Sequence, residues 1–246
     1  MQPRQFERVD WRPGPAYRPD RWPFTMPVVE QLINNGGLDI PPGVTIVVGE
    51  NGSGKSTLVE ALAAVYPRTG ALSPFTSLTG VTGSAEDSPL ATCLKARTHR
   101  MASPAGFFLR AEAMHSYFAR VDADPTQRRA WGGEALNERS HGESFLAVLR
   151  HRFTDLGVYF LDEPEAALSF QSCLSLIALL DQMRKEGSQV IVATHSPLLA
   201  SLPDATLLEV GEWGLRQTTY DDLQLVHNWR SYLDAPQRWL RHLLDT

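Results

Sequence analysis

Cysteines and long apolar runs are scarce in this sequence. It holds two cysteines among 246 residues, Cys93 and Cys173, too few for a disulfide framework or a cysteine-based metal cluster. We therefore expect a reducing, cytoplasmic environment. No run is apolar and long enough to span a bilayer, and the first residues lack the apolar core of a signal peptide. These absences argue against a secreted or membrane-spanning protein.

An excess of positive charge is also absent. The formal net charge of -5 argues against a generally basic nucleic-acid-binding surface. Two short basic runs, residues 95–100 and 150–152, leave a local nucleic-acid patch open, but we favour solvated helix faces there. With 43% hydrophobic and 21% charged residues, the composition is that of an ordinary globular protein of one large or two small domains.

A phosphate-binding loop is the most informative feature that is present. Residues 49–57 read GENGSGKST and fit the pattern G-x-x-x-x-G-K-[ST]. The run before it, residues 44–48, is apolar and β-branched, as a buried parallel strand should be, and residues 58–65 are rich in helix formers. A strand, a glycine loop and a helix in this order favour a true phosphate site over a chance glycine-rich turn.

The chemistry of this loop follows from its residue types. Its backbone N–H groups and the helix N-terminus would surround the phosphates of a nucleotide. Lys55 would reach the β- and γ-phosphates, and the Ser56 hydroxyl would ligate Mg²⁺. The expected nucleotide-binding residues are Gly49, Glu50, Asn51, Gly52, Ser53, Gly54, Lys55, Ser56 and Thr57.

Alternating apolar strands and helices predict an α/β fold with a mostly parallel sheet. We expect strands over residues 44–48, 107–112, 158–161 and 189–193, and helices over 28–35, 58–65, 113–121, 140–152 and 174–186. Residues 1–27 should have little regular structure and residues 68–89 should form a loop. From residue 220 onwards we expect two short packed helices, broken at Pro236.

Three polar side chains follow buried strands of this predicted sheet. Asp162 and Glu163 end the strand at 158–161, and His195 directly follows the strand at 189–193. The carboxyl ends of parallel strands face the crevice that holds the ligand. Asp162 would hold Mg²⁺ together with Ser56, and Glu163 would polarise the attacking water. His195 would bind the γ-phosphate or that water.

A short motif before these acids has two interpretations. Residues 140–145, SHGESF, fit a helix start, because Ser140 suits an N-cap and Glu143 completes a capping box. That alone explains the spacing. The motif gains weight because it lies 22 residues before Asp162 (162 minus 140) and after a phosphate loop.

These motifs together resemble the ATP-binding-cassette (ABC) class of ATPases. The phosphate loop, S-x-G-E before a helix, an apolar strand ending in Asp-Glu-Pro and a strand ending in His occur in class order over about residues 28–204. SHGES stands where the class carries LSGGQ: Ser140 and Gly142 match, whereas Arg139, His141 and Glu143 depart from Leu, Gly and Gln. Residues 165–169, EAALS, match the D-loop after the catalytic Glu.

More narrowly, GENGSGKST, GFFLRAE, SHGESF, LDEPEAALS and ATHSP resemble small stand-alone bacterial cassette proteins labelled AAA-family ATPases, relatives of chromosome-maintenance and break-repair ATPase heads. The resemblance implies a P-loop NTPase fold: an ABC-type ATPase head with a mostly parallel sheet core and a smaller helical lobe. We expect one domain over residues 1–246. Its core lobe would take about residues 28–70 and 153–215, the signature-bearing helical lobe 71–152, and C-terminal helices 220–246.

The resemblance also implies a composite site. In the class, ATP lies between two heads, and the phosphate loop of one faces the signature of the other. Ser140, Gly142 and Glu143 would thus act on the nucleotide of a second copy. A helix N-terminus with a hydroxyl suits a γ-phosphate. We expect an ATP-dependent homodimer with ATP and Mg²⁺ as cofactors.

Two class features are poorly matched. The class places a Gln between the lobes to contact Mg²⁺ and water, but no Gln occurs here from residue 55 to 124. Glu112 is our candidate for that place and for a further metal ligand, with Arg110 as the alternate; a charged surface pair is an equal interpretation. Phe24 or Trp22 could stack on the nucleotide base. The absence of a guanine-reading motif favours ATP over GTP.

These observations favour a Mg²⁺-dependent cytoplasmic ATPase that acts as a dimeric clamp on a macromolecular partner. One alternative is the nucleotide-binding subunit of a membrane transporter, against which the altered signature and the missing Gln stand. Others are a DNA-repair or defence-associated ATPase and a non-hydrolysing regulator. Glu163 argues for hydrolysis, and the net charge does not indicate nucleic acid.

Overall fold

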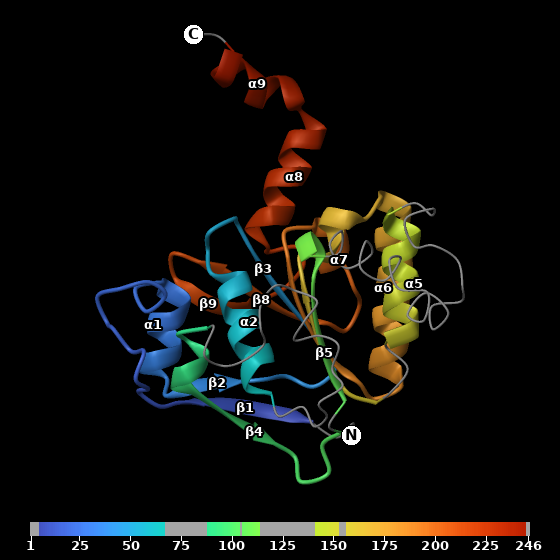
Figure 1. Cartoon of the computed structure of the whole chain (residues 1–246). Helices are drawn as coiled ribbons and strands as arrows, with labels where there is room; N and C mark the ends of the chain where they lie inside the picture. Colours follow the sequence, from blue (N-terminus) through green and yellow to red (C-terminus); the bar gives the residue numbers. More distant parts are fainter. Residues whose placement is uncertain (1–4, 67–87, 104, 114–140, 153–155, 245–246) are drawn as a thin grey trace.

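A six-stranded sheet organises the protein, as the computed structural model shows for residues 5–66, 88–103, 105–113, 141–152 and 156–244 (Figure 1). In spatial order the strands are β5 (Gly106–Arg110), β6 (Val158–Asp162), β7 (Gln189–Thr194), β3 (Val44–Gly49), β8 (Thr206–Gly211) and β9 (Gly214–Thr218). The first five pair in parallel, and β9 pairs antiparallel with β8 at the edge. The parallel arrangement brings the carboxyl ends of β3, β5, β6 and β7 to one edge of the sheet.

Two hydrophobic cores cover the two faces of this sheet. Because side chains alternate along a strand, β3 sends Ile46 into one core and Val47 into the other. On one face the sheet packs against α1 (Pro27–Asn34) and α2 (Lys55–Val65). On the other it packs against α5 (His141–Arg152), α6 (Phe170–Lys185) and α7 (Pro197–Ala200), and α5 and α6 lie side by side (Figure 1).

A second, smaller sheet corrects two predictions. β1 (Phe6–Trp11) lies between β2 (Gly37–Asp39) and β4 (Leu94–Thr98), and both pairings are antiparallel. The expectation of little regular structure over residues 1–27 was therefore wrong for β1, which is anchored by the buried side chains of Phe6 and Val9. The basic run from residue 95 is largely a strand and not a helix face, because β4 alternates exposed Lys95 and Arg97 with half-buried neighbours.

Short 3₁₀ turns connect several elements at the edges of the two sheets. They are η1 (Ala91–Cys93), η2 (Ala111–Ala113) and η4 (Pro164–Ala167). η1 leads into β4, η2 follows β5 and η4 follows β6. η2 and η4 thus begin at the carboxyl ends of the parallel strands β5 and β6, beside the crevice.

The chain ends in two helices that project from the body, α8 (Gln224–Asp234) and α9 (Pro236–Leu244) (Figure 1). The predicted break at Pro236 is confirmed. The expectation of packed helices holds for the start of α8, where Val226 is buried. Further along, α8 and α9 contact each other, but the expectation fails for Leu233 and Leu243, which are 68% and 71% exposed.

The structure confirms the predicted α/β class and the strands at 44–48, 158–161 and 189–193. Within the described ranges, every helix is too short or too polar to traverse a lipid bilayer. The predicted helix at 113–121, nearly all of the predicted loop at 68–89, and Ser140 lie outside the described residues. The proposed division into a core lobe and a helical lobe stays a prediction.

Candidate nucleotide site

The predicted phosphate loop connects the end of β3 to the start of α2. Gly52 and Gly54 adopt φ values of 80° and 105°, in the left-handed region that disfavours residues with a Cβ. A Cβ on Gly54 would also lie 2.8 Å from Val28 Cγ1 and 2.9 Å from Met26 Cε. The two glycines thus let the loop turn sharply and deliver the N-terminus of α2 to the crevice.

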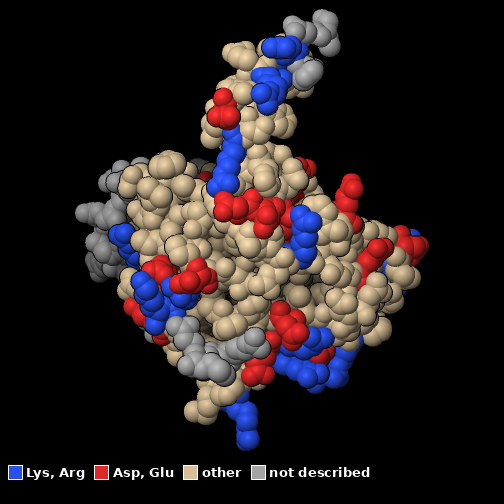
Figure 2. Space-filling view, turned by 180° about the vertical axis from the view of Figure 1, so that it is seen from behind, with Lys and Arg blue, Asp and Glu red and all other residues tan. Residues whose placement is uncertain are grey.

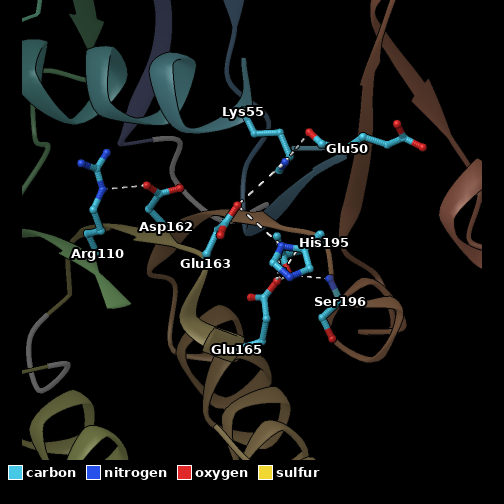
Figure 3. Close-up of polar contacts among 9 residues, drawn as sticks. Glu50, Lys55, Arg110, Asp162, Glu163, Glu165, His195 and Ser196 are labelled. Carbon is cyan, nitrogen blue, oxygen red and sulfur yellow. Dashed lines mark hydrogen bonds and ion pairs between the residues drawn. The ribbon is translucent and has the colours of Figure 1, made fainter. Parts of the chain in front are cut away.

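Lys55 is the first residue of α2, and its side chain is almost fully buried. Its Nζ donates a 2.8 Å hydrogen bond to the carbonyl of Glu50 and lies 4.0 Å from Glu163 Oε1 (Figure 3). Burial lowers the pKa of Lys55, although nearby carboxylates, Glu163 foremost, oppose the shift. The loop therefore holds a poorly hydrated cation where a phosphate would bind.

Asp162, at the tip of β6, is held by an arginine. Arg110 is its register partner at the end of β5, and Arg110 Nε donates to Asp162 Oδ2 at 3.0 Å. The same guanidinium reaches Glu60 on α2. Burial lowers the pKa of Arg110, but Glu60 and Asp162 outweigh it and leave the pKa above its ordinary value. Arg110, our alternate candidate for the missing Gln, is thus the residue that contacts Asp162, whereas Glu112 is exposed in η2.

Glu163 lies between two functional side chains. Its backbone adopts φ 48° and ψ 50°, a left-handed conformation that is uncommon for a residue with a side chain. The hydrogen bond from its N–H to the Ala193 carbonyl, at 2.9 Å, fixes this turn against β7. Its Oε1 lies 3.6 Å from His195 Nδ1 as well as 4.0 Å from Lys55 Nζ (Figure 3). Uncommon backbone conformations of this kind cluster at functional sites, which fits the predicted role of Glu163.

Glu165 was missed as a functional residue by the sequence analysis. Its Oε1 accepts hydrogen bonds from Thr194 Oγ1 at 2.5 Å and from the backbone N–H of His195 at 2.8 Å, and lies 3.5 Å from His195 Nδ1. This carboxylate fixes the end of β7 and the backbone of His195, whereas the nearby imidazole Nδ1 has no hydrogen-bond partner among the described residues. Its position inside the D-loop match was a signal, but the sequence did not reveal its partners.

A pocket of about 440 Å³ brings the predicted residues together. It is lined by Trp22, Met26, Asn51, Gly52, Gly54, Lys55, Ser56, Thr57, Arg110, Glu112, Asp162 and Glu163. Trp22 is 64% exposed and lines this pocket, so it stays the candidate for base stacking, whereas Phe24 is buried against Trp11 and Tyr17. Phe24 was therefore a wrong candidate for base stacking. The remaining loop residues, Gly49, Glu50 and Ser53, line an adjoining groove with His195.

The residues at this pocket fit a magnesium ion bound with a nucleotide. Asp162 Oδ1 is buried and has no hydrogen-bond partner among the described residues, so one carboxylate oxygen is left to accept a bound water or ion. Ser56 lines the same pocket. Carboxylate and hydroxyl oxygens suit Mg²⁺, which usually keeps several waters and phosphate oxygens as its other ligands.

The predicted signature motif is described only in part. α5 begins at His141, and Ser140, the N-cap that the sequence predicts, lies outside the described residues. Gly142 and Glu143 belong to the first turn of α5, and the structure describes their backbone but not their side chains. Their contact with a second copy stays a prediction.

Comparisons with known proteins agree with this arrangement. The family model "AAA domain, putative AbiEii toxin, Type IV TA system" matches residues 140–201, and a second model, "AAA domain", matches residues 31–86. The ribose import ATP-binding protein RbsA of Roseobacter denitrificans is 28% identical over 189 residues, which cover 70% of this chain and 37% of that protein. The chain thus spans little more than a third of this relative.

Two further matches cover nearly all of the matching protein. The cytochrome c biogenesis ATP-binding export protein CcmA of Roseobacter denitrificans is 27% identical over 203 residues, which cover 76% of this chain and 91% of that protein. The solved structure "An inward-facing conformation of a putative metal-chelate type ABC transporter" aligns with a TM-score of 0.52 at 12% identity over 93% of this chain and 89% of that one. The chain thus has the fold of an ABC-type ATP-binding protein, and it is similar to such proteins over its phosphate loop and its Asp162–Glu163 strand end.

Proposed function

We propose that the protein is a cytoplasmic Mg²⁺-dependent ATPase that works as an ATP-dependent homodimeric clamp on a macromolecular partner. The position of Glu163 is the main support for hydrolysis: its carboxylate lies 4.0 Å from Lys55 Nζ and 3.6 Å from His195 Nδ1. A carboxylate between a phosphate-binding cation and an imidazole is suited to activate water beside a bound γ-phosphate.

The proposed reaction uses each of these groups once. The γ-phosphate binds at Lys55 and at the N-terminus of α2, where the cation and free N–H groups stabilise its charge. Glu163 accepts a proton from a water whose oxygen attacks the γ-phosphorus. The bond from that phosphorus to the bridging oxygen breaks, which releases ADP and phosphate. His195, oriented by Glu165, holds the water or the γ-phosphate. Mg²⁺ bound between Ser56 and Asp162 would neutralise phosphate charge.

The dimer completes the site in this proposal. Ser140 and the first turn of α5 in one copy would bind the γ-phosphate held by Lys55 in the other. ATP would then hold two copies together, and loss of the γ-phosphate would release them. The sequence match of residues 140–145 to the class signature supports this step.

The Glu163→Gln variant tests both parts of the proposal. It keeps the size of the side chain but cannot take a proton, so we expect phosphate release to fall by about 10²- to 10⁴-fold while ATP still binds. On a sizing column with Mg-ATP, the variant should elute as a dimer and, without nucleotide, as a monomer. Glu186→Gln, at an exposed position after α6, is the matched control and should behave as wild type. A monomeric Glu163→Gln protein at saturating Mg-ATP would refute the clamp.

A transporter role is the second candidate, because the relatives named above are import and export ATP-binding proteins. In that case the protein would co-purify with a membrane protein. A DNA-acting role would rest on the basic strand β4, although Arg97 there pairs with Asp10. ATPase assays with and without duplex DNA separate this role from the others: stimulated turnover supports it, and absence of all turnover supports a regulator.

A further inference from the structure

The two C-terminal helices form an arm that extends away from the sheet (Figure 1). We define the C-terminal arm as residues 224–244, which comprise α8 and α9. The helices pack on each other, and Trp239 Nε1 donates a 3.2 Å hydrogen bond to Ser231 Oγ. The arm is therefore a structured element and not two separate tails.

The base of the arm is fixed to the strand beside the phosphate loop. Glu209 on β8 is 3% exposed, and its Oε1 accepts a 2.7 Å hydrogen bond from the N–H of Gln224, the first residue of α8. Its Oε2 accepts from Arg216 at 2.6 and 2.9 Å, and Glu209 is the register partner of Val48 in β3. Because a buried, fully bonded carboxylate is costly to disturb, the orientation of α8 follows that of the phosphate-loop strand.

An apolar stripe runs along the arm. On α8, positions 225, 229, 232 and 233 follow helical spacing and carry Leu, Trp, Tyr and Leu. The exposed members are Trp229 46%, Tyr232 38%, Leu233 68%, Trp239 42%, Leu243 71% and Leu244 72%. Together they expose apolar surface on the order of several hundred Å², as much as the largest patch on a typical monomer. A patch of this size marks an interaction surface.

The stripe begins inside a groove that borders the phosphate loop. This groove has a volume of about 1080 Å³ and lies between loop residues Asn51 and Ser53, the exposed Trp213 and, on the arm, Leu225 and Trp229. The apolar side of the arm is thus continuous with the face of the protein that carries the nucleotide. In the dimer proposed above, this is the face that a second copy covers.

The charge of the arm also fits contact with a second copy of the chain. Residues 224–244 contain three arginines and one aspartate, while the whole chain has a net charge of -5, so the arm is basic and the remainder is acidic. Figure 2 shows mainly Lys and Arg side chains along the projecting arm, with an acidic group among them, and groups of both signs over the body. A basic arm complements the acidic body of another copy, and complementary charge favours that encounter.

We infer that the apolar side of the C-terminal arm docks on a second copy of this chain and extends the dimer interface beyond the nucleotides. This inference rests on the proposed ATP-dependent dimer. A stable interface needs about 800 Å² from each partner, and the arm supplies apolar area for a large part of it. Because the base of the arm is fixed beside β3, a change in the position of this phosphate-loop strand would also change the docking of the arm.

The test uses the full chain with Glu163→Gln, which should trap the dimer in Mg-ATP. In that background, Leu233→Ser with Leu243→Ser removes two of the three most exposed side chains of the stripe, and neither residue lines the groove. We expect the dimer dissociation constant, measured by sedimentation, to rise at least about tenfold, with the ATP affinity of the monomer unchanged. Met101→Ser with Leu156→Ser, two exposed apolar residues elsewhere, is the matched control and should not change the dissociation constant.

Each outcome separates the two proposals. If the Glu163→Gln protein dimerises and the arm variant dimerises equally well, the arm inference fails and the clamp stands. If Glu163→Gln alone stays monomeric, the clamp fails, and the arm inference fails with it. A photo-reactive residue at position 243 should cross-link to the body of a second copy in Mg-ATP. Cross-linking only within one chain, or binding of the arm to anionic phospholipid vesicles with an unchanged dimer, would overturn the inference.

Discussion

Substitution of Arg110 tests how the charges of this site stabilise the protein. Its guanidinium bridges Asp162, whose side chain is 4% exposed, and Glu60, while Arg110 itself is 24% exposed. Burial raises the pKa of Glu60 in spite of this arginine. Arg110 thus forms ion pairs with two carboxylates in a poorly hydrated crevice, and Arg110→Gln removes both pairs while keeping a planar amide of moderate size.

The expected loss of stability follows from the burial of the pair. Removing one partner of a fully buried pair costs about 3–5 kcal/mol, and an exposed pair contributes about 0–1 kcal/mol. For this partly buried bridge we expect about 2 kcal/mol without ligand, a fall in Tm of roughly 4–8 °C for a chain of this size. With Mg-ATP the gap between variant and wild type should shrink to about half, because Mg²⁺ supplies a countercharge to Asp162.

Differential scanning calorimetry with and without Mg-ATP measures both gaps. Arg110→Lys keeps the charge but cannot bridge two carboxylates with a planar fork, so its Tm should be intermediate. Arg100→Gln, at an exposed position, is the control and should leave Tm unchanged. A wild-type Tm for Arg110→Gln without ligand, or an undiminished gap in Mg-ATP, would refute the reasoning.

Two further predictions concern Glu165 and Tyr66. Glu165→Ala removes the acceptor that holds Thr194 and His195, so we expect kcat to fall about tenfold with little change in KM, and Glu165→Gln to recover part of it; equal losses in kcat and nucleotide affinity would contradict a positioning role. Burial raises the pKa of Tyr66 to about 12, so its stabilising effect is complete below about pH 10 and is lost as the pH rises towards 12. In urea titrations at pH 8 and pH 11, wild type should therefore lose about 1.4 kcal/mol relative to Tyr66→Phe, and a constant difference would refute this.

The buried parallel strands could be predicted because their sequences are unambiguous. Residues 44–48 and 189–193 are continuous apolar runs, and such runs are typical of strands covered on both faces. β1 and β4 could not be predicted in this way. They belong to a small antiparallel sheet with mixed exposure, so Arg8 and Lys95 read as loop or helix-face residues until the pairing partners are known.

In the candidate site too, local motifs could be predicted from the sequence, but contacts between distant residues could not. Lys55 and Ser56 follow from one short motif, because the phosphate loop is a local structure. The bridge from Arg110 to Asp162 joins residues 52 positions apart, and the bond from Glu165 to Thr194 joins residues 29 apart. Such pairings depend on which strands become neighbours, and a single sequence does not specify that order.

The strand β6 explains why one sequence pattern, an apolar run followed by two acids, predicts both a strand and a candidate site. Its side chains alternate between the two cores, with Phe160 in one and Leu161 in the other, and this burial fixes the height at which the strand ends. Asp162 and Glu163 follow at that end, and the left-handed turn at Glu163 aims its carboxylate away from Asp162 and between Lys55 and His195. Two adjacent acids thus acquire different partners, an arginine for one and a lysine and an imidazole for the other. In the proposed reaction, this difference would allow Asp162 to hold Mg²⁺ and Glu163 to activate the attacking water.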